Sequence, residues 1–324
     1  MAKLISPLNQ AALRAEDFAR AELGGEEKAP DCGRGLGHQL KKAFWENKMA
    51  AVSLAILLLI AAGALAAPFL PQDPDYMDVL NKMAPPSGEH WLGTDELGRD
   101  TFTRVLYGSR ISLLVGIATM IVSVVAGTLV GTISGYAGGK TDAVLMRIVD
   151  MFQSVPSLLM IIVIFSFIPN NMVTLVFMLA LFSWTGVARI VRAQTLTLKE
   201  RDFVAAARTL GVGHTTIIMR HIIPNMSAQI IVAASLSIAG AILDESALSF
   251  LGYGVALPMS SWGSMLQNAQ QYILYDPLLA LVPGLFILLT VLCLNILGDA
   301  LQYALDPRLH KIVSNDVWKN ESNK

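Results

Sequence analysis

Long stretches without charge are the feature that most constrains this chain. Five runs of 22 to 38 residues contain no Asp, Glu, Lys or Arg: Met49–Gln72, Ile111–Gly139, Met151–Ala188, Ile222–Leu243 and Pro277–Gly298. A helix of about 20 apolar residues is long enough to cross the roughly 30 Å hydrocarbon core of a membrane. The chain therefore reads as an all-α, polytopic membrane protein.

The composition supports this interpretation. Of 324 residues, 54% are hydrophobic and 15% are charged, and the mean hydropathy is +0.54. A soluble domain carries roughly 25% charged residues, so this is not the composition of a soluble enzyme or a disordered chain. The net charge of −1 gives no basic excess for binding nucleic acid. Two cysteines are too few for a disulfide framework.

The runs predict six transmembrane helices. The stretch 151–188 is too long for one span, and Pro169-Asn170-Asn171 is a turn signal within it. We therefore divide it into a helical hairpin, with Pro156 expected to kink its first helix. The six predicted spans are 49–69, 111–134, 143–168, 172–192, 227–250 and 278–299.

Basic residues predict the orientation. With the N-terminus inside, 20 of the 24 Lys and Arg lie in cytoplasmic segments and four lie outside. This bias follows the positive-inside rule and places both termini, 1–48 and 304–324, in the cytoplasm. The first apolar run begins too deep for a cleaved signal peptide. Within the N-terminal tail, Asn9 to Leu23 is compatible with an amphipathic surface helix or with a loosely ordered segment.

The exterior loop 70–110 carries seven acidic residues and several prolines. We expect an interfacial helix over Asp95–Tyr107, with Thr94 as its N-cap, running into the second span. Trp and Tyr are enriched at membrane interfaces. The aromatic residues expected at the outer interface are Trp91, Tyr107, Trp262 and Tyr272.

Two acidic residues lie near the outer end of the fifth span. Asp244 and Glu245 are candidates for lining a transport pathway, because acids at membrane depth usually face protein or water. The alternative is a structural partner such as Arg104 or Arg110. At the inner end of the third span, Arg147 and Asp150 are spaced for a local ion pair, and an interface contact is the alternative.

The segment 195–225 is the most informative cytoplasmic loop. It predicts a helix over Glu200 to Gly211, a glycine turn, and a second apolar stretch that ends at Pro224. Small residues at Ala206 and Ala207 permit the close approach of another surface. Docking of a partner and a plain surface loop are both compatible with this pattern.

This loop resembles the EAA loop of ABC-importer permeases, E-A-A-x3-G-x9-I-x-L-P. The positions that match are Ala206, Ala207, Gly211, Ile223 and Pro224. Ala205 stands where the family usually has Glu, and His221 stands where it has Ile. Asp202, one turn earlier, is available to replace part of the missing charge.

Three further segments resemble C-type permease subunits of the dipeptide, oligopeptide and nickel family. They are Gly93–Asp100 with Tyr107–Ser112, Glu245–Gly252 with Ser261-Trp262-Gly263, and Gly298–Leu301 with Leu305–Arg308. Gln302 and Tyr303 depart from the usual charged pair. The resemblance covers about 90–310 and implies a type I, MetI-like core of five helices at 111–303 plus a peripheral first helix.

The resemblance also implies a function. The chain would be one permease subunit of an ATP-driven bacterial importer in the cytoplasmic membrane, taking up di- or oligopeptides delivered by an extracytoplasmic binding protein. It would pair with a sister permease and with two ATPase subunits that bind ATP and Mg. The chain itself has no G-x-x-x-x-G-K-[ST] phosphate loop. Residues implied in ATPase coupling are Asp202, Ala205, Ala206, Ala207, Gly211, His221 and Pro224.

Other functions are weaker matches. A nickel importer would keep the architecture and change the cargo, but no cluster of His, Cys or Met marks a metal path, and the scattered histidines form no ligand set. An intramembrane protease would need paired catalytic groups at one depth, and we find none. A passive channel would have no need for an EAA-like loop. We therefore expect a transport subunit without cofactor, metal site or enzymatic activity of its own.

Overall fold

The computed structural model describes residues 47–169, 171–255 and 259–305. The regular secondary structure of this part of the chain is helical, apart from one isolated β-bridge between Thr94 and Asp100. Five of its helices are long and apolar enough to cross a membrane, and a bent helix pair makes a sixth candidate. The predicted tail helix at Asn9–Leu23 lies outside the described residues.

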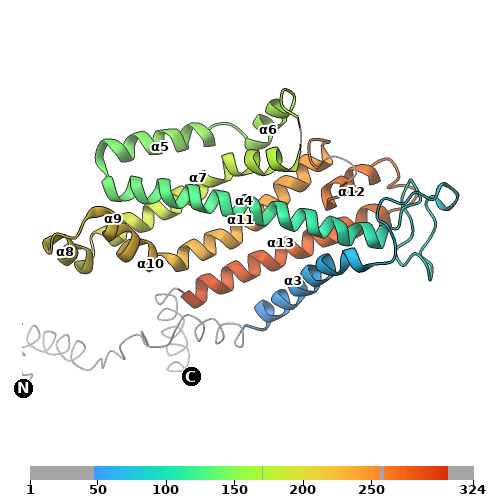
Figure 1. Cartoon of the computed structure of the whole chain (residues 1–324), viewed down its shortest axis with the longest axis horizontal. Helices are drawn as coiled ribbons and strands as arrows, with labels where there is room; N and C mark the ends of the chain where they lie inside the picture. The colour runs from blue at the N-terminus through green and yellow to red at the C-terminus, as the bar shows by residue number, and fades with distance from the viewer. Residues whose placement is uncertain (1–46, 170, 256–258, 306–324) are drawn as a thin grey trace, which may run out of the picture.

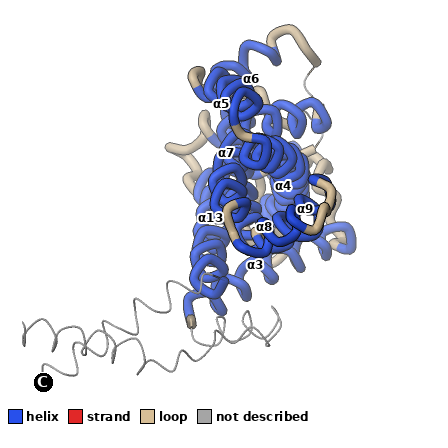
Figure 2. The backbone as a smooth tube through the Cα atoms, turned by 90° about the vertical axis from the view of Figure 1, so that its left-hand side faces the viewer, coloured by secondary structure: helices blue, strands red, loops and turns tan. Residues whose placement is uncertain are grey.

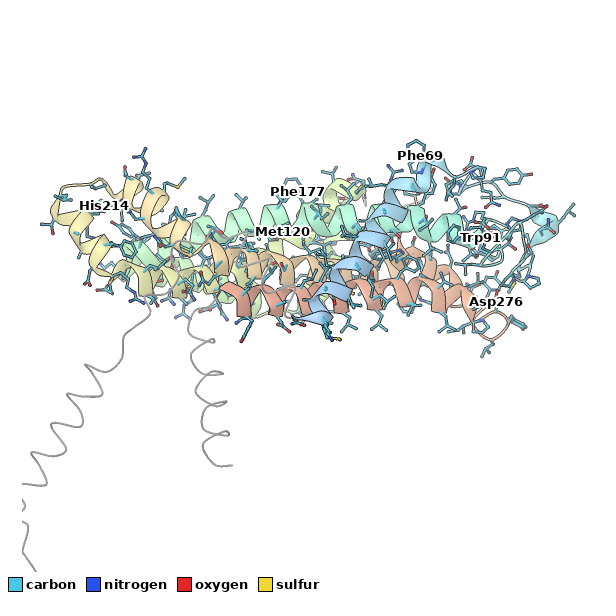
Figure 3. All side chains as sticks on the ribbon, turned by 90° about the horizontal axis from the view of Figure 1, so that it is seen from below. Phe69, Trp91, Met120, Phe177, His214 and Asp276 are labelled. Carbon is cyan, nitrogen blue, oxygen red and sulfur yellow. The ribbon has the colours of Figure 1, made fainter. Side chains whose placement is uncertain are left out.

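The long helices form one elongated bundle (Figure 1). The five long helices are α3 (Lys48–Ala66), α4 (Thr101–Ala137), α7 (Met172–Lys199), α11 (Ser227–Phe250) and α13 (Leu278–Leu305). Helices α4, α7, α11 and α13 run lengthwise. Helix α3 packs mainly on α13 and α4, and it crosses the bundle obliquely in Figure 3. It therefore lies at the periphery, as predicted for the first helix.

Short elements gather at the two ends of the bundle. One end carries α8 (Asp202–Thr209), α9 (His214–Ile217), the π-helical turn η3 (Ile218–Ile222) and α10 (Ile223–Asn225). The other end carries two 3₁₀ turns, Ala67–Phe69 and Val79–Asn81, and α12 (Trp262–Ala269). Figure 3 shows His214 at the first end, with Trp91 and Asp276 at the second. We call these the α8 end and the loop end.

The predicted third span, 143–168, is not one continuous helix. It is divided into α5 (Gly139–Gln153) and α6 (Ser157–Phe165), which meet at an angle of 74°. Pro156 is the N-cap residue of α6, where its missing N–H is tolerated. The proline therefore ends one helix and begins another instead of kinking a single span. Figure 2 shows α5 and α6 at the edge of the bundle.

The predicted helix over Asp95–Tyr107 is wrong in its first turn. Helix α4 begins at Thr101, and its N-cap is Asp100, whose carboxylate accepts the Thr103 N–H at 2.8 Å. Thr94 lies in the preceding loop. The Asp95 carboxylate accepts the N–H groups of Leu97 and Arg99, so it holds a turn instead of a helix. Gly98, at φ +79°, completes that turn.

Close packing of α4 on α7 forms the centre of the bundle. Gly127, Gly131 and Gly135 follow one face of α4 and meet α7 so closely that a Cβ atom would clash at each position. At Gly131 such an atom would lie 2.5 Å from the carbonyl oxygen of Ala188. Small residues at this spacing let helix backbones approach in a membrane. The two helices therefore behave as one rigid unit.

Candidate functional site

The 195–225 loop is folded against the end of the bundle that carries α8. Val204 and Ala207 of α8 are buried in one cluster with Ile217, Ile222 and, from α7, Val191. The opposite face of α8 is exposed at Asp202, Ala205 and Ala206. The loop thus has one face that is held by its own chain and one face that is free for another surface.

Gly211 closes α8 with a Schellman motif. Its backbone lies in the left-handed region at φ +75°. The Gly211 N–H donates to the Arg208 carbonyl at 3.0 Å, and the Val212 N–H donates to the Ala207 carbonyl at 3.1 Å. Val212 then packs in the same cluster as Ala207. This is the hydrogen-bond and contact pattern that ends helices at a glycine, so Gly211 fixes the angle between α8 and α9.

The exposed tip of the loop is partly apolar. The Leu210 side chain is 82% exposed, and Phe203 and Met219 are 40% and 59% exposed. Ala205 and Ala206 are exposed as well. An exposed apolar surface that includes small residues is suited to contact with a protein partner.

A contact network that the sequence analysis did not predict joins the loop to the end of α4. The Tyr136 hydroxyl lies 2.9 Å from Nδ1 of His214, and the Arg208 guanidinium lies over the Tyr136 ring at 5.3 Å from its centroid. Lys199 Nζ donates to the Gly135 carbonyl at 3.1 Å. The loop is therefore fastened to α4 from both α8 and α9. No sequence spacing links Tyr136 to residues more than 70 positions away.

His221 and Pro224 lie where the loop returns to the bundle. His221 is half-buried within the π-helical turn Ile218–Ile222, and its carbonyl accepts the Asn225 side-chain amide at 2.6 Å. Pro224 is exposed in the first turn of α10. Because proline has no N–H, it removes one regular helix bond, and the wider π-turn precedes it. The chain then enters α11.

Ion pairs hold α5 to α7. Asp142 accepts from Nε and Nη2 of Arg192 at 2.5 and 2.6 Å, a bidentate arrangement. Asp150 pairs with Arg189 of α7 at 2.6 Å. Of the two alternatives for Arg147 and Asp150, the local pair is wrong, because the Asp150 carboxylate turns towards the neighbouring helix. The interface contact stays a prediction.

Glu245 is fully buried at the loop end of α11. The Ser249 hydroxyl donates to its Oε1 at 2.6 Å, and the Ser112 hydroxyl donates to its Oε2 at 3.2 Å. The predicted partners Arg104 and Arg110 are wrong for this residue, because Arg104 pairs with Asp75 and Asp95 of the loop. The serines of α4 and α11 thus replace a cation as partners of the carboxylate.

Trp262 extends this polar network to α12. Its backbone N–H donates to Ser112 Oγ at 3.2 Å, and its indole N–H lies 3.2 Å from both the Val105 carbonyl and Ser109 Oγ. Trp262 has no exposed surface, so its predicted interfacial position is wrong. Trp91, by contrast, is 67% exposed at the loop end. Because both polar groups of Trp262 are satisfied inside, it anchors α12 on α4.

Asp244 differs from its neighbour. It is half-buried on α11, and no hydrogen bond or ion pair is formed with it in the described part of the chain. Gly240, one turn earlier, faces open space. The structure thus separates the two predicted pathway acids, one enclosed by serines and one on an open face. Within the described ranges, no three His, Cys, Asp or Glu residues are grouped to hold a metal ion.

Comparison with protein families gives two matches. Residues 127–311 match the family described as "Binding-protein-dependent transport system inner membrane component". Residues 36–86 match the "N-terminal TM domain of oligopeptide transport permease C". The two matches together include the five long helices except for Thr101–Ala126, the larger part of α4.

Curated relatives match over nearly the whole chain. The oligopeptide transport system permease protein OppC of Bacillus subtilis (strain 168) is 40% identical over 294 residues, which cover 90% of this chain and 96% of the relative. The protein of the same name from Haemophilus influenzae is 41% identical, with coverage of 93% and 97%. The dipeptide transport system permease protein DppC of B. subtilis is 40% identical, with coverage of 82% and 84%.

A solved structure has a similar fold. A chain of the inward-facing MetNI methionine ABC transporter superposes with a TM-score of 0.52 at 17% sequence identity. The match covers 61% of this chain and 94% of that chain. The architecture described above is therefore that of a known transporter subunit, with additional residues in this chain.

Proposed function

Because the chain belongs to the family of binding-protein-dependent transport system inner membrane components, we propose that it is a permease subunit of an ATP-driven importer of di- or oligopeptides. The observation that supports peptides as the transported substrate is the match at about 40% identity, over most of the chain, to permeases named for oligopeptides and dipeptides. These names favour peptide over the nickel alternative. ATP hydrolysis is assigned to separate subunits.

The 195–225 segment, which we call the coupling loop, is the proposed contact with an ATPase subunit. Its free face presents the small side chains of Ala205 and Ala206, and its other face is fixed to α4 and α7. A displacement of α8 by the ATPase would therefore move α4 and α7 with it as a rigid body. Asp202 lies on the free face, whereas Gly211, His221 and Pro224 lie where the loop turns and fix its shape.

The proposed orientation places the α8 end and both termini in the cytoplasm. Its support is the distribution of Lys and Arg, 20 of 24 of which fall on that side. The loop end, with α12 and residues 70–100, then faces the extracytoplasmic binding protein. The family description supports location in the inner membrane. The remaining proposed partners are a sister permease and two ATPase subunits, which bind ATP and Mg.

The sister permease would complete the transport pathway. Asp244 lies on a face of α11 that this chain leaves partly open, and an acid within a membrane-spanning helix usually faces protein or water. We assign Asp244 to the pathway, where a carboxylate suits the α-ammonium group of a peptide. The buried position of Glu245 supports a different task for it, which is to hold α4, α11 and α12 together.

Peptide uptake in cells tests the proposal. The gene for this chain would be deleted and restored, and uptake of labelled dipeptide, labelled pentapeptide and radioactive nickel would be compared with and without ATP depletion. We expect restored, ATP-dependent uptake of at least one peptide. Restored uptake of nickel alone would show that the transported substrate is nickel and not a peptide. Restored uptake that survives ATP depletion would contradict the coupling role.

A further inference from the structure

A groove between α3 and α4 at the loop end is not used by any function discussed so far. It has a volume of about 630 Å³, within the range of roughly 300–1,000 Å³ that is usual for ligand sites. Its apolar walls are Ala61, Ala64 and Leu65 of α3 and Ile111, Leu113, Leu114 and Ile117 of α4. Leu65 and Leu114 are 75% and 52% exposed, so the groove is open along its length.

The polar residues of the groove border its apolar part on the loop side. They are Asp75 of the loop, Tyr107 and Arg110 of α4, and Ser260 before α12, and their chain neighbours Pro74 and Met259 also line the groove. Asp75 is already paired with Arg104, at 3.5 Å. The Arg110 guanidinium lies 5.8 Å from the Tyr107 ring centroid, and within the described part of the chain no carboxylate pairs with it. The groove therefore offers one cation without an anionic partner.

The order of these residues along α4 matches the depth profile of a membrane leaflet. Arg110 is the last charged residue before the uncharged run that begins at Ile111. Ile117 lies seven positions after Arg110, a distance of about 10 Å along the helix axis. A molecule with an anionic head at Arg110 would thus lay its tail on Ile111, Leu114 and Ile117, at the level of the hydrocarbon core.

We propose that this groove binds a phospholipid of the leaflet at the loop end, with its phosphate on Arg110 and an acyl chain between α3 and α4. Arginine is well suited to phosphate because its planar guanidinium presents several donors. Basic pockets between membrane helices bind anionic headgroups by the same chemistry. A peptide fits this groove less well, because its apolar walls leave backbone polar groups without partners. The inference requires membrane insertion and is independent of the cargo.

Bound lipid would hold the peripheral helix to the core. Helix α3 contacts α4 and α13, and no polar contact between the α3 and α4 side chains is formed in the described residues. A lipid that fills the groove would add apolar contact on both helices at once. The position of α3 relative to α4 would then depend on occupancy by lipid.

Photolabelling of the intact, reconstituted transporter tests the proposal. Vesicles would carry a trace of phosphatidylglycerol with a photoactivatable group in its acyl chain, and labelled peptides would be mapped by mass spectrometry. We expect labelling concentrated at 61–65 and 111–117, compared with the lipid-facing residues of α6. Arg110→Gln is expected to lower labelling at both sites by roughly tenfold. An uncharged diacylglycerol probe should label them weakly and without regard to Arg110.

A second variant keeps the test informative if Arg110→Gln fails to assemble. Leu114→Trp fills the groove from an exposed position, whereas Ile121→Trp places the same side chain on an exposed part of α4 outside it. Labelling should fall in the first variant and persist in the second. Lys82→Gln serves as the control for lost charge at the loop end. Equal labelling in all variants, or a cross-link from position 114 to the sister permease in place of lipid, would overturn the proposal.

Discussion

At Gly211 a single backbone dihedral sets the direction of the coupling loop. A side chain in the left-handed region costs about 1–2 kcal/mol, and most for β-branched residues. No atom would contact a Cβ here, so the cost arises from the backbone alone. We expect Gly211→Val to lower ATP-dependent uptake by roughly tenfold, the factor that corresponds to about 1.4 kcal/mol, while the protein remains in the membrane.

Gly213 provides the matched control. It also has open space around it, but its φ of −63° suits any residue. Gly213→Ala should therefore transport at the rate of the unaltered protein. Uptake, membrane level and stimulation of ATPase activity would be measured for both variants. Normal uptake by Gly211→Val would show that the angle between α8 and α9 is not needed for coupling.

The two faces of α8 can be distinguished with one substitution at two positions. Ala205 is exposed and Ala207 is 6% exposed within the apolar cluster. Ala205→Glu restores the residue usual in the resembling family and should leave uptake within about twofold of normal, since exposed substitutions change stability by at most about 0.5 kcal/mol. Ala207→Glu buries a charge and should destabilise the loop by at least about 3 kcal/mol.

The measurement for this pair is co-purification of the ATPase with the permease, together with uptake. Loss of both in Ala205→Glu would require a different register for the loop. Preserved association in Ala207→Glu would mean that the charged side chain escapes to solvent, so that the buried face is not needed. The end of the first loop helix at Gly211 was predictable from sequence because a glycine at this position commonly ends a helix. The contact of Tyr136 with Arg208 and His214 was not, because it depends on tertiary folding.

At the scale of elements, close packing of α4 on α7 is what the proposed coupling requires, since α7 and α4 both contact the coupling loop. Gly131→Ala places a Cβ atom 2.5 Å from a carbonyl oxygen of α7, and overpacking of this kind costs about 1–3 kcal/mol. We expect a lower midpoint for thermal aggregation in detergent and reduced uptake. Gly284→Ala in α13 is the control, since its nearest neighbour lies at 4.0 Å. Equal midpoints for both variants would contradict rigid packing of α4 on α7.

The membrane spans were predictable because absence of charge over 20 or more residues is a strong signal in itself. The breaks within the spans were harder to predict. Hydropathy does not show whether Pro156 bends one helix or separates two helices, as it does between α5 and α6. The sequence predicts a helix in the loop before α4 because Thr94 and Asp95 are residues that commonly begin helices. In the structure, the Asp95 side chain binds the turn that ends at Arg99 instead.

At the scale of the molecule, the two ends of the bundle are built differently. The α8 end presents a small exposed face held by apolar contacts, which suits repeated engagement by a partner. The loop end is tied by buried polar groups, with Glu245, Ser112 and Trp262 linking three helices. Composition and hydropathy did not predict this network, because serines contribute little to either. The proposed function requires both features, an α8 end that an ATPase subunit can bind and a loop end that stays rigid when the α8 end is displaced.

The pathway assignment of Asp244 gives a prediction for the assembled transporter. If its carboxylate meets the peptide α-ammonium, Asp244→Asn should raise the KM for free peptides by roughly tenfold, the loss expected for one charged hydrogen bond. Peptides with an acetylated amino terminus lack that charge and should be taken up equally by both proteins. Asp299→Asn, which alters an exposed acid at the α8 end of α13, should change neither. The decisive comparison is the ratio of the two KM values, because a structural defect lowers uptake of both peptides alike. An unchanged ratio would therefore show that Asp244 does not meet the peptide α-ammonium group.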